Sequence, residues 1–306
     1  MLIMSPVLAL STSNWFIIWV SLEMNMLSFL FIIWEKSNLS INSMIKYLII
    51  QAFASSFLFM TMILFKNNFF SDFWSMMIIF IMSIKLGLSP FHFWYPQVGE
   101  GLNWISLLIL STWQKIIPLF VCSMNTISFM LNTIILLSIL FSALNMFNQT
   151  SIRKLFIYSS IIHLCWIMVA LDSNSDMWIF YLLIYSFILG SMVLLFYKKN
   201  FSSVTQIKYC NNSLKFMLLM TVFSLSGLPP FLGFLPKWMM ILNSYMNNSL
   251  MLFFLIMGSF ISCFLYLRIL WNSVLTNSMT KKYDNFLSMT VIMNSMGLFI
   301  ISPFLF

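Results

Sequence analysis

The stretch SGLPPFLGFLPKW at residues 226–238 decides the fold, because it places glycines, prolines and a lysine inside an apolar segment. That segment, 214–246, is longer than the roughly 20 residues that a bilayer-spanning helix needs. Proline removes a backbone donor and blocks the helical ladder, so Gly227, Pro229 and Pro230 predict a single broken helix. The sequence therefore predicts a membrane protein with a helix that is interrupted within the bilayer.

A second copy of this motif lies in the first half of the chain. GLSPF at residues 87–91 repeats the pattern of GLPPF at residues 227–231, and Gly87 and Pro90 mark the predicted break. Paired, proline-interrupted helices in two halves of a chain are typical of transporters built from inverted repeats. A chance similarity of two proline kinks is the alternative, because Leu, Phe and Ser are common in this sequence.

The composition excludes a soluble domain. Hydrophobic residues make up 61% of the 306 residues and charged residues only 7%, whereas soluble domains carry roughly a quarter charged residues. The segments long enough to span a bilayer are 15–34, 44–65, 73–94, 104–121, 127–147, 155–171, 177–197, 214–246, 250–271 and 286–305. A short segment at 1–10 completes a prediction of about eleven transmembrane helices in one all-α domain covering residues 1–306.

The loop charges predict an orientation. If each segment crosses once, one face collects Lys36, Lys46, Arg153, Lys154, Lys198, Lys199, Lys208, Lys215, Arg268, Lys281 and Lys282. The other face collects Lys66, Asp72, Asp172 and Asp176. Because basic loops stay on the cytoplasmic or matrix side, the basic face is predicted to lie there. The net charge of +8 is explained by this orientation and does not indicate nucleic-acid binding.

Four ionisable residues lie inside predicted spans: Glu23, Lys85, Lys115 and Lys237. A charge near the bilayer centre costs about 2.5–3.5 kcal/mol on insertion scales. One carboxylate cannot neutralise three lysines, so the remaining lysines must be hydrated or partly neutral. A desolvated lysine that is partly neutral can accept and release a proton. The sequence therefore predicts a proton relay.

Each of these residues also has a structural interpretation. Lys115 or Lys237 could extend to a helix end, Glu23 could serve only as an ion-pair partner, and carbonyls freed by the break could solvate Lys85.

The histidines and cysteines give weaker indications of function than the buried lysines. His163 lies mid-segment, where its imidazole either bridges water between lysines or is a hydrogen-bonded structural group. His92 follows Pro90 closely, which favours a structural or access role. The cysteines have no metal-binding spacing and are interpreted as packing residues; they are Cys122, Cys165, Cys210 and Cys263. No nucleotide motif, haem ligand pair or iron–sulfur cluster motif is present, so the chain is predicted to move protons and not electrons.

Several runs carry a family resemblance: KLGLSPFHFWYP at 85–96, WQK at 113–115 followed by Pro118, QTSIRK at 149–154, YSSIIH at 158–163, and the 226–238 stretch. Together they resemble the antiporter-like membrane subunits of respiratory complex I, from about Asn14 to the C-terminus. The resemblance implies two inverted five-helix repeats, each with one broken helix, and a chain without the first three helices of the full family fold.

The family also implies roles for the charged residues. Glu23 would pair with Lys85 at the entrance of a proton path, and Lys115 would be the central relay. Lys237 would serve the exit towards the intermembrane space, and His163 would lie on the hydrated axis between the halves. Proton translocation would be coupled to NADH oxidation and ubiquinone reduction elsewhere in the complex, so the chain would be a subunit of an NADH:ubiquinone reductase.

The same resemblance implies a location and partners. The chain would cross the mitochondrial inner membrane many times, and a composition rich in Phe (34) and Met (27) and poor in Gly (8) favours an AT-rich organellar genome. It would hold no cofactor, with NADH, FMN, iron–sulfur clusters and ubiquinone in other subunits. Its partners would be the neighbouring antiporter-like subunit 4, the small subunit 4L, accessory subunits and membrane lipids. The alternatives are a self-standing cation/proton antiporter and a non-conducting scaffold.

Overall fold

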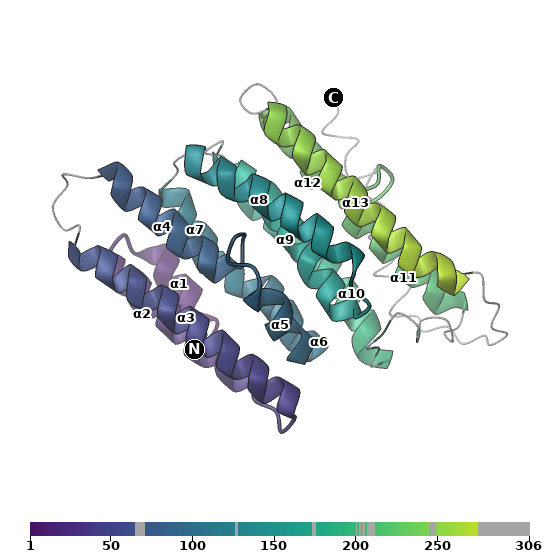
Figure 1. Ribbon diagram of the computed structural model, residues 1–306, viewed down its shortest axis with the longest axis horizontal. Helices are drawn as coiled ribbons and strands as arrows, with labels where there is room; N and C mark the ends of the chain where they lie inside the picture. Colours follow the sequence, from purple (N-terminus) through teal and green to yellow (C-terminus); the bar gives the residue numbers. More distant parts are fainter. Residues whose placement is uncertain are drawn as a thin grey trace. The chain divides into compact units, whose positions relative to one another are not determined.

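The computed structural model describes residues 1–64, 71–125, 128–172, 176–199, 201, 203, 206, 212–244 and 249–274. Within these ranges the regular structure is helical (Figure 1), and no strand is present beyond an isolated bridge between Ser151 and Ser203. The predicted all-α class is therefore confirmed. The predicted span 286–305 lies outside the described residues.

Seven helices in the described ranges are long and apolar enough to cross a bilayer: Trp15–Ile33, Asn38–Leu64, Trp104–Met124, Phe129–Phe147, Ile152–Asp172, Met177–Tyr197 and Ser249–Arg268. Two more of the predicted spans, 73–94 and 214–246, are divided into shorter helices by their glycines and prolines. The chain is thus an integral membrane protein, while the total of about eleven spans stays a prediction.

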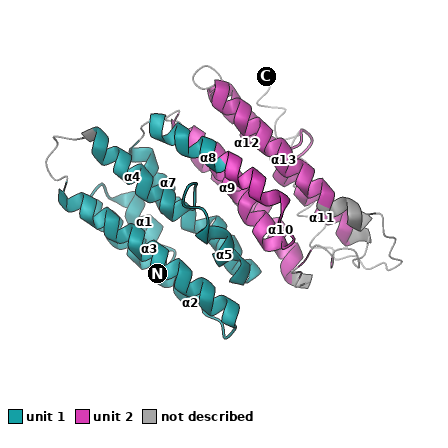
Figure 2. Cartoon of the chain, in the orientation of Figure 1, with its two compact units in different colours: residues 1–138 teal, residues 139–306 magenta. Residues whose placement is uncertain are grey.

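The described chain forms two compact units, shown in teal and magenta in Figure 2. The first unit, Met1–Ser138, contains α1 (Met4–Ser11), α2 (Trp15–Ile33), α3 (Asn38–Leu64), α4 (Ser71–Leu86), α5 (Trp94–Gly101), α6 (Trp104–Ser111), the 3-10 turn η2 (Trp113–Lys115), α7 (Ile116–Met124) and part of α8 (Ser128–Phe147). Helix α3 is central, because it packs against α2, α4 and α5.

The second unit, Ile139–Phe306, contains the rest of α8, α9 (Ile152–Asp172), α10 (Met177–Lys199), α11 (Asn212–Ser226), α12 (Phe234–Ser244) and α13 (Ser249–Val274). Helix α9 packs against α10, α12 and α13. Every residue from Leu155 to Leu171 in α9 is buried, so this helix is enclosed on all sides, as expected of a core helix.

The first interruption begins with a glycine cap. Helix α4 ends at Leu86, and Gly87 adopts a φ of 72°, in the left-handed region. The Leu88 N–H donates to the Ser83 carbonyl at 3.0 Å, and the Gly87 N–H donates to the Ile84 carbonyl at 3.2 Å. These two bonds form a Schellman motif, which satisfies carbonyls at the end of the helix and turns the chain away.

The second interruption begins in the same way. Helix α11 ends at Ser226, and Gly227 has a φ of 76°. The Gly227 N–H donates to the Ser224 carbonyl at 3.2 Å, and the Leu228 N–H donates to the Phe223 carbonyl at 3.4 Å. The repeated sequence motif is therefore a repeated structure: a Schellman cap, a proline-containing turn and a short second helix.

A third interruption, which the sequence did not predict, lies within the span Trp104–Met124. Helix α6 ends at Ser111, Thr112 leaves helical geometry with φ −121° and ψ −69°, and a 3-10 turn leads into α7. Pro118 has no N–H to donate to the Gln114 carbonyl four residues earlier, and its ring crowds that carbonyl. The local ladder is therefore weakened at the turn that carries Lys115.

Candidate functional site

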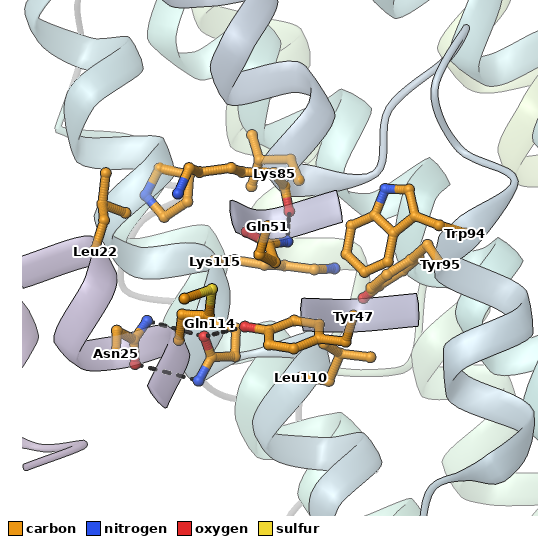
Figure 3. A pocket seen from close by; sticks show the side chains of 13 residues that line it. Leu22, Asn25, Tyr47, Gln51, Lys85, Trp94, Tyr95, Leu110, Gln114 and Lys115 are labelled. Atoms are coloured by element: carbon orange, nitrogen blue, oxygen red, sulfur yellow. Dashed lines mark hydrogen bonds between the residues drawn. The ribbon is translucent and has the colours of Figure 1, made fainter. Parts of the chain in front are cut away.

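A polar pocket lies within the first unit, between apolar helices (Figure 3). Its walls come from α2, α3, α4, α5, α6, η2 and α7, and the space between them is large enough to hold water. The pocket is lined by Leu22, Asn25, Met26, Tyr47, Gln51, Lys85, Leu86, Trp94, Tyr95, Leu110, Gln114, Lys115 and Pro118. Two of the predicted relay lysines therefore meet at one pocket.

Lys85 lies in the last turn of α4, directly before the first interruption, and only 7% of its surface is exposed. The Gln51 amide on α3 donates to the Lys85 carbonyl at 3.2 Å, and the Trp94 indole donates to the Ile84 carbonyl at 3.1 Å. These side chains supply donors to carbonyls in the last turn of α4, where the helical ladder ends, and the Ile84 carbonyl also accepts from the Gly87 N–H. Glu23, half-buried on α2, interacts electrostatically with Lys85.

Lys115 ends the 3-10 turn and is 3% exposed, so its side chain stays inside the protein. Its ammonium nitrogen lies 5.4 Å from the centroid of the Tyr95 ring. A cation over an aromatic face is attracted by the ring quadrupole, which partly replaces lost hydration. In Figure 3 the Gln51 side chain lies between Lys85 and Lys115.

Two hydrogen-bonded amide side chains line the pocket next to Lys115. Asn25 Nδ2 donates to Gln114 Oε1 at 2.9 Å, and Gln114 Nε2 donates to Asn25 Oδ1 at 3.2 Å. The Tyr47 hydroxyl donates to the same Gln114 oxygen at 3.2 Å. Figure 3 shows these bonds joining three elements, α2, α3 and η2.

Lys237 occupies the second interruption. It lies on α12, is 6% exposed, and its ammonium donates to the Ser226 carbonyl at the end of α11 at 2.7 Å. The C-terminal end of a helix carries partial negative charge, which favours a cation there. The side chain runs against Gly227, where an added Cβ would meet Lys237 Nζ at 3.0 Å. Lys237 therefore folds back into the break and does not extend to the surface.

The histidines occupy hydrogen-bonded positions. His163 on α9 is 8% exposed, and its Nδ1 lies 2.9 Å from the Tyr181 hydroxyl on α10. Its ring lies 4.8 Å from the Tyr185 ring. Helix α9 packs against α12, which carries Lys237. In the first unit, His92 Nδ1 lies 2.9 Å from the Ser89 hydroxyl within the interrupted segment.

Glu23, Lys85 and Lys115 thus come together in the first unit, and His163 and Lys237 belong to the second. Asn25, Tyr47, Gln51 and Gln114 are further site residues, beyond those predicted from the sequence. The signal was available, because amide side chains within apolar spans face protein or water and seek hydrogen-bond partners.

One predicted loop cation is placed differently. Lys215, predicted among the loop charges of the basic face, lies in the first turn of α11 with 3% of its surface exposed. Its place as the second residue of the predicted segment 214–246 does not reveal this burial, which packing decides.

Cys122 and Cys165 are buried thiols, Cys263 is a partly buried thiol, and Cys210 lies outside the described residues. Among the residues that the structure describes, no group of three or more His, Cys, Asp or Glu side chains could hold a metal ion.

The chain resembles known proteins over most of its length. Residues 12–264 match the family described as NADH:quinone oxidoreductase/Mrp antiporter, TM. The NADH-ubiquinone oxidoreductase chain 2 of Anopheles gambiae is 39% identical over 289 residues, covering 90% of this chain and 85% of the mosquito protein. The protein of the same name from Bos taurus is 33% identical over 306 residues, covering 92% and 88%.

Solved structures share the fold at low sequence identity. A chain of respiratory complex I from Thermus thermophilus with bound aureothin superposes with a TM-score of 0.83 at 20% identity, covering 97% of this chain and 74% of the bacterial one. A chain of the Mrp complex from Dietzia sp. gives a TM-score of 0.77 at 14% identity, covering 91% and 60%.

Proposed function

Because the chain belongs to the NADH:quinone oxidoreductase/Mrp antiporter family, and within it to the NADH-ubiquinone oxidoreductase chain 2 proteins, we propose that it translocates protons as a membrane subunit of that enzyme. The resemblance in the sequence motifs is confirmed by these relatives. NADH oxidation and ubiquinone reduction take place in other subunits, and this chain contributes the proton path.

The proposed path follows the buried charges. Glu23 and Lys85 form its entrance, Lys115 is the central relay, and His163 leads towards Lys237 at the exit. Quinone reduction elsewhere changes the field at Glu23 and Lys85, and this change alters the proton affinity of Lys115 along a water chain. Opposite charges about 4 Å apart at an effective dielectric near 20 interact by about 4 kcal/mol, which is enough to load or release a proton.

The burial of three lysines is the observation that carries the proposal. Lys85, Lys115 and Lys237 are 7%, 3% and 6% exposed, and each lies at an interruption of a helix. Burying an ammonium group costs several kcal/mol. Burying three lysines in this way does not stabilise the fold, so a role in moving charge explains their burial best.

The environment of the subunit is also proposed from its family. The chain crosses the mitochondrial inner membrane with its basic loops facing the matrix. Its partners are other membrane-arm subunits, among them the neighbouring antiporter-like subunit 4, the small subunit 4L and accessory subunits, together with lipids. The NADH, FMN, iron–sulfur and ubiquinone sites belong to other subunits.

The central relay is tested by Lys115→Met in the assembled complex. Methionine keeps the length of the side chain but carries no proton, so the number of protons moved per NADH is expected to fall. The measurement compares proton uptake into membrane vesicles with NADH oxidation. Lys46→Met is the matched control, because Lys46 is exposed in the same unit and bonds Gln97 at 2.9 Å. A normal proton-to-electron ratio in Lys115→Met would rule out the relay.

A second candidate function is a self-standing cation/proton antiporter. The fold likeness to a chain of the Mrp complex from Dietzia sp. favours it. The two functions differ in one measurable way: only a self-standing antiporter moves ions without the other subunits.

A further inference from the structure

The 3-10 turn that carries Lys115 is held from outside its own helix. Pro118 removes the backbone bond that would tie Gln114 into the ladder, and Thr112 has already left helical geometry. A mid-helix 3-10 turn of this kind often marks a hinge. Two backbone bonds remain, from the Lys115 N–H to the Thr112 carbonyl and from the Ile116 N–H to the Trp113 carbonyl. Side chains of the turn tie it to other elements: the Trp113 indole donates to the Leu2 carbonyl at 2.8 Å, and Gln114 is bonded to α2 and α3 at the side facing Lys115's pocket.

The bond to α2 is reciprocal. Each amide of the Asn25–Gln114 pair donates to the other, at 2.9 and 3.2 Å, so distance and direction are both restrained. Tyr47 adds a third bond to the Gln114 oxygen. Asn25 and Tyr47 are 3% and 2% exposed, and buried amides that lose a partner pay the cost of desolvation. The pair therefore resists separation.

Helix α2 also carries Glu23, two residues before Asn25. Glu23 interacts electrostatically with Lys85, and Asn25 is bonded to the residue preceding Lys115. One helix thus carries both a carboxylate that acts electrostatically on Lys85 and an amide that is hydrogen-bonded to the residue next to Lys115. A displacement of α2 is passed to the Lys115 turn through two directional bonds.

We propose that Asn25, Gln114 and Tyr47 are positioning residues for Lys115, and that the amide pair keeps its ammonium group in register with movements of α2. The proposal rests on the proposed proton translocation. In this proposal, none of the three residues accepts or releases the translocated proton. Their function is to keep the 3-10 turn against α2, so that the ammonium group remains beside Tyr95 and facing the pocket.

The test uses Gln114→Met, Asn25→Leu and the double variant in the assembled complex. Both substitutions preserve bulk and remove the amides. Each single variant is expected to lower the protons moved per NADH, and the double variant to match the worse single variant, because either change already breaks the pair. Gln97→Met is the control, since Gln97 is an exposed amide in the same unit.

A merely structural role has a different signature. It would lower the amount of assembled complex on a native gel and leave the proton-to-electron ratio of each assembled complex normal, and that result would overturn the proposal. Losses that add up in the double variant would do the same. If Gln114→Met does not assemble, Tyr47→Phe decides: it keeps the ring, removes one bond, and is expected to lower the ratio by less, whereas an unchanged ratio overturns the proposal.

The failure of this proposal is distinguishable from that of the proposed function. If Lys115→Met lowers the ratio and the amide variants do not, only the positioning role is wrong. If Lys115→Met itself has a normal ratio, the relay is wrong, whatever the amide variants do.

Discussion

At the scale of the residue, the three buried lysines are stabilised by three different groups. Lys85 interacts electrostatically with the Glu23 carboxylate, Lys115 lies over the Tyr95 ring, and Lys237 donates to the Ser226 carbonyl. The three ammonium groups therefore lie in different electrostatic surroundings, which is compatible with the proposed relay.

Lys237→Met is expected to lower the protons moved per NADH while the complex still assembles. The charge-assisted bond to Ser226 contributes about 1.5–3 kcal/mol, and its loss is offset by removing a buried charge. The measurement is the proton-to-electron ratio together with the amount of assembled complex. The exposed Lys46→Met serves as control, and a variant that pumps normally would place Lys237 outside the path.

At the scale of the element, the two interruptions share a Schellman cap and differ in where the lysine lies. Lys85 comes two residues before Gly87, and Lys237 comes ten residues after Gly227. In the first unit the Trp94 indole donates to the Ile84 carbonyl near the end of α4. In the second, the ammonium of Lys237 takes the carbonyl at the end of α11. In the first unit the lysine therefore comes from the helix before the break, and in the second unit from the helix after it.

Gly233→Ala is expected to disrupt the second interruption far more than Gly258→Ala disrupts α13. A Cβ at Gly233 would overlap the Ser224 carbonyl oxygen, which is backbone and cannot move aside. A Cβ at Gly258 would meet Ile139 Cγ2 at 2.8 Å and Ile162 Cγ2 at 4.0 Å, which are side-chain methyl groups and not backbone. Overpacking costs about 1–3 kcal/mol, and Gly233→Ala should lie at or above the top of that range.

The measurement is the thermal denaturation of the assembled complex, with both variants compared with the unsubstituted protein. Equal midpoints for the two variants would show that the turn at Gly233 can relax, contrary to the packing described here.

At the scale of the whole molecule, the chain is a membrane component whose activity is proposed to depend on its complex. Seven helices in the described residues are suited to span the bilayer, and no redox group is proposed within them. Under the proposed function, the energy for proton movement comes from electron transfer in other subunits.

The purified chain alone, reconstituted in liposomes, is therefore expected not to exchange sodium for protons. The readout is a pH-sensitive dye inside the liposomes during a sodium pulse, with protein-free liposomes as the blank and a known sodium/proton antiporter as the positive control. A sodium-dependent change in internal pH with the chain alone would favour the self-standing antiporter instead.

The sequence by itself determined the class of the protein and the places where its helices break. Apolar spans, Gly87 with Pro90, and Gly227 with Pro229 act locally, because proline removes a donor and glycine accepts a left-handed turn regardless of distant contacts. The presence of lysines inside spans was equally visible, since span length follows from hydropathy alone.

Only the tertiary structure decided which groups surround those lysines. Asn25 and Gln114 lie 89 positions apart, and neither is marked by its neighbours as a partner of the other. Lys215 is buried although its position suggested a loop. Contacts of this kind depend on how helices pack, and packing depends on the shape of whole faces, which a local pattern does not contain.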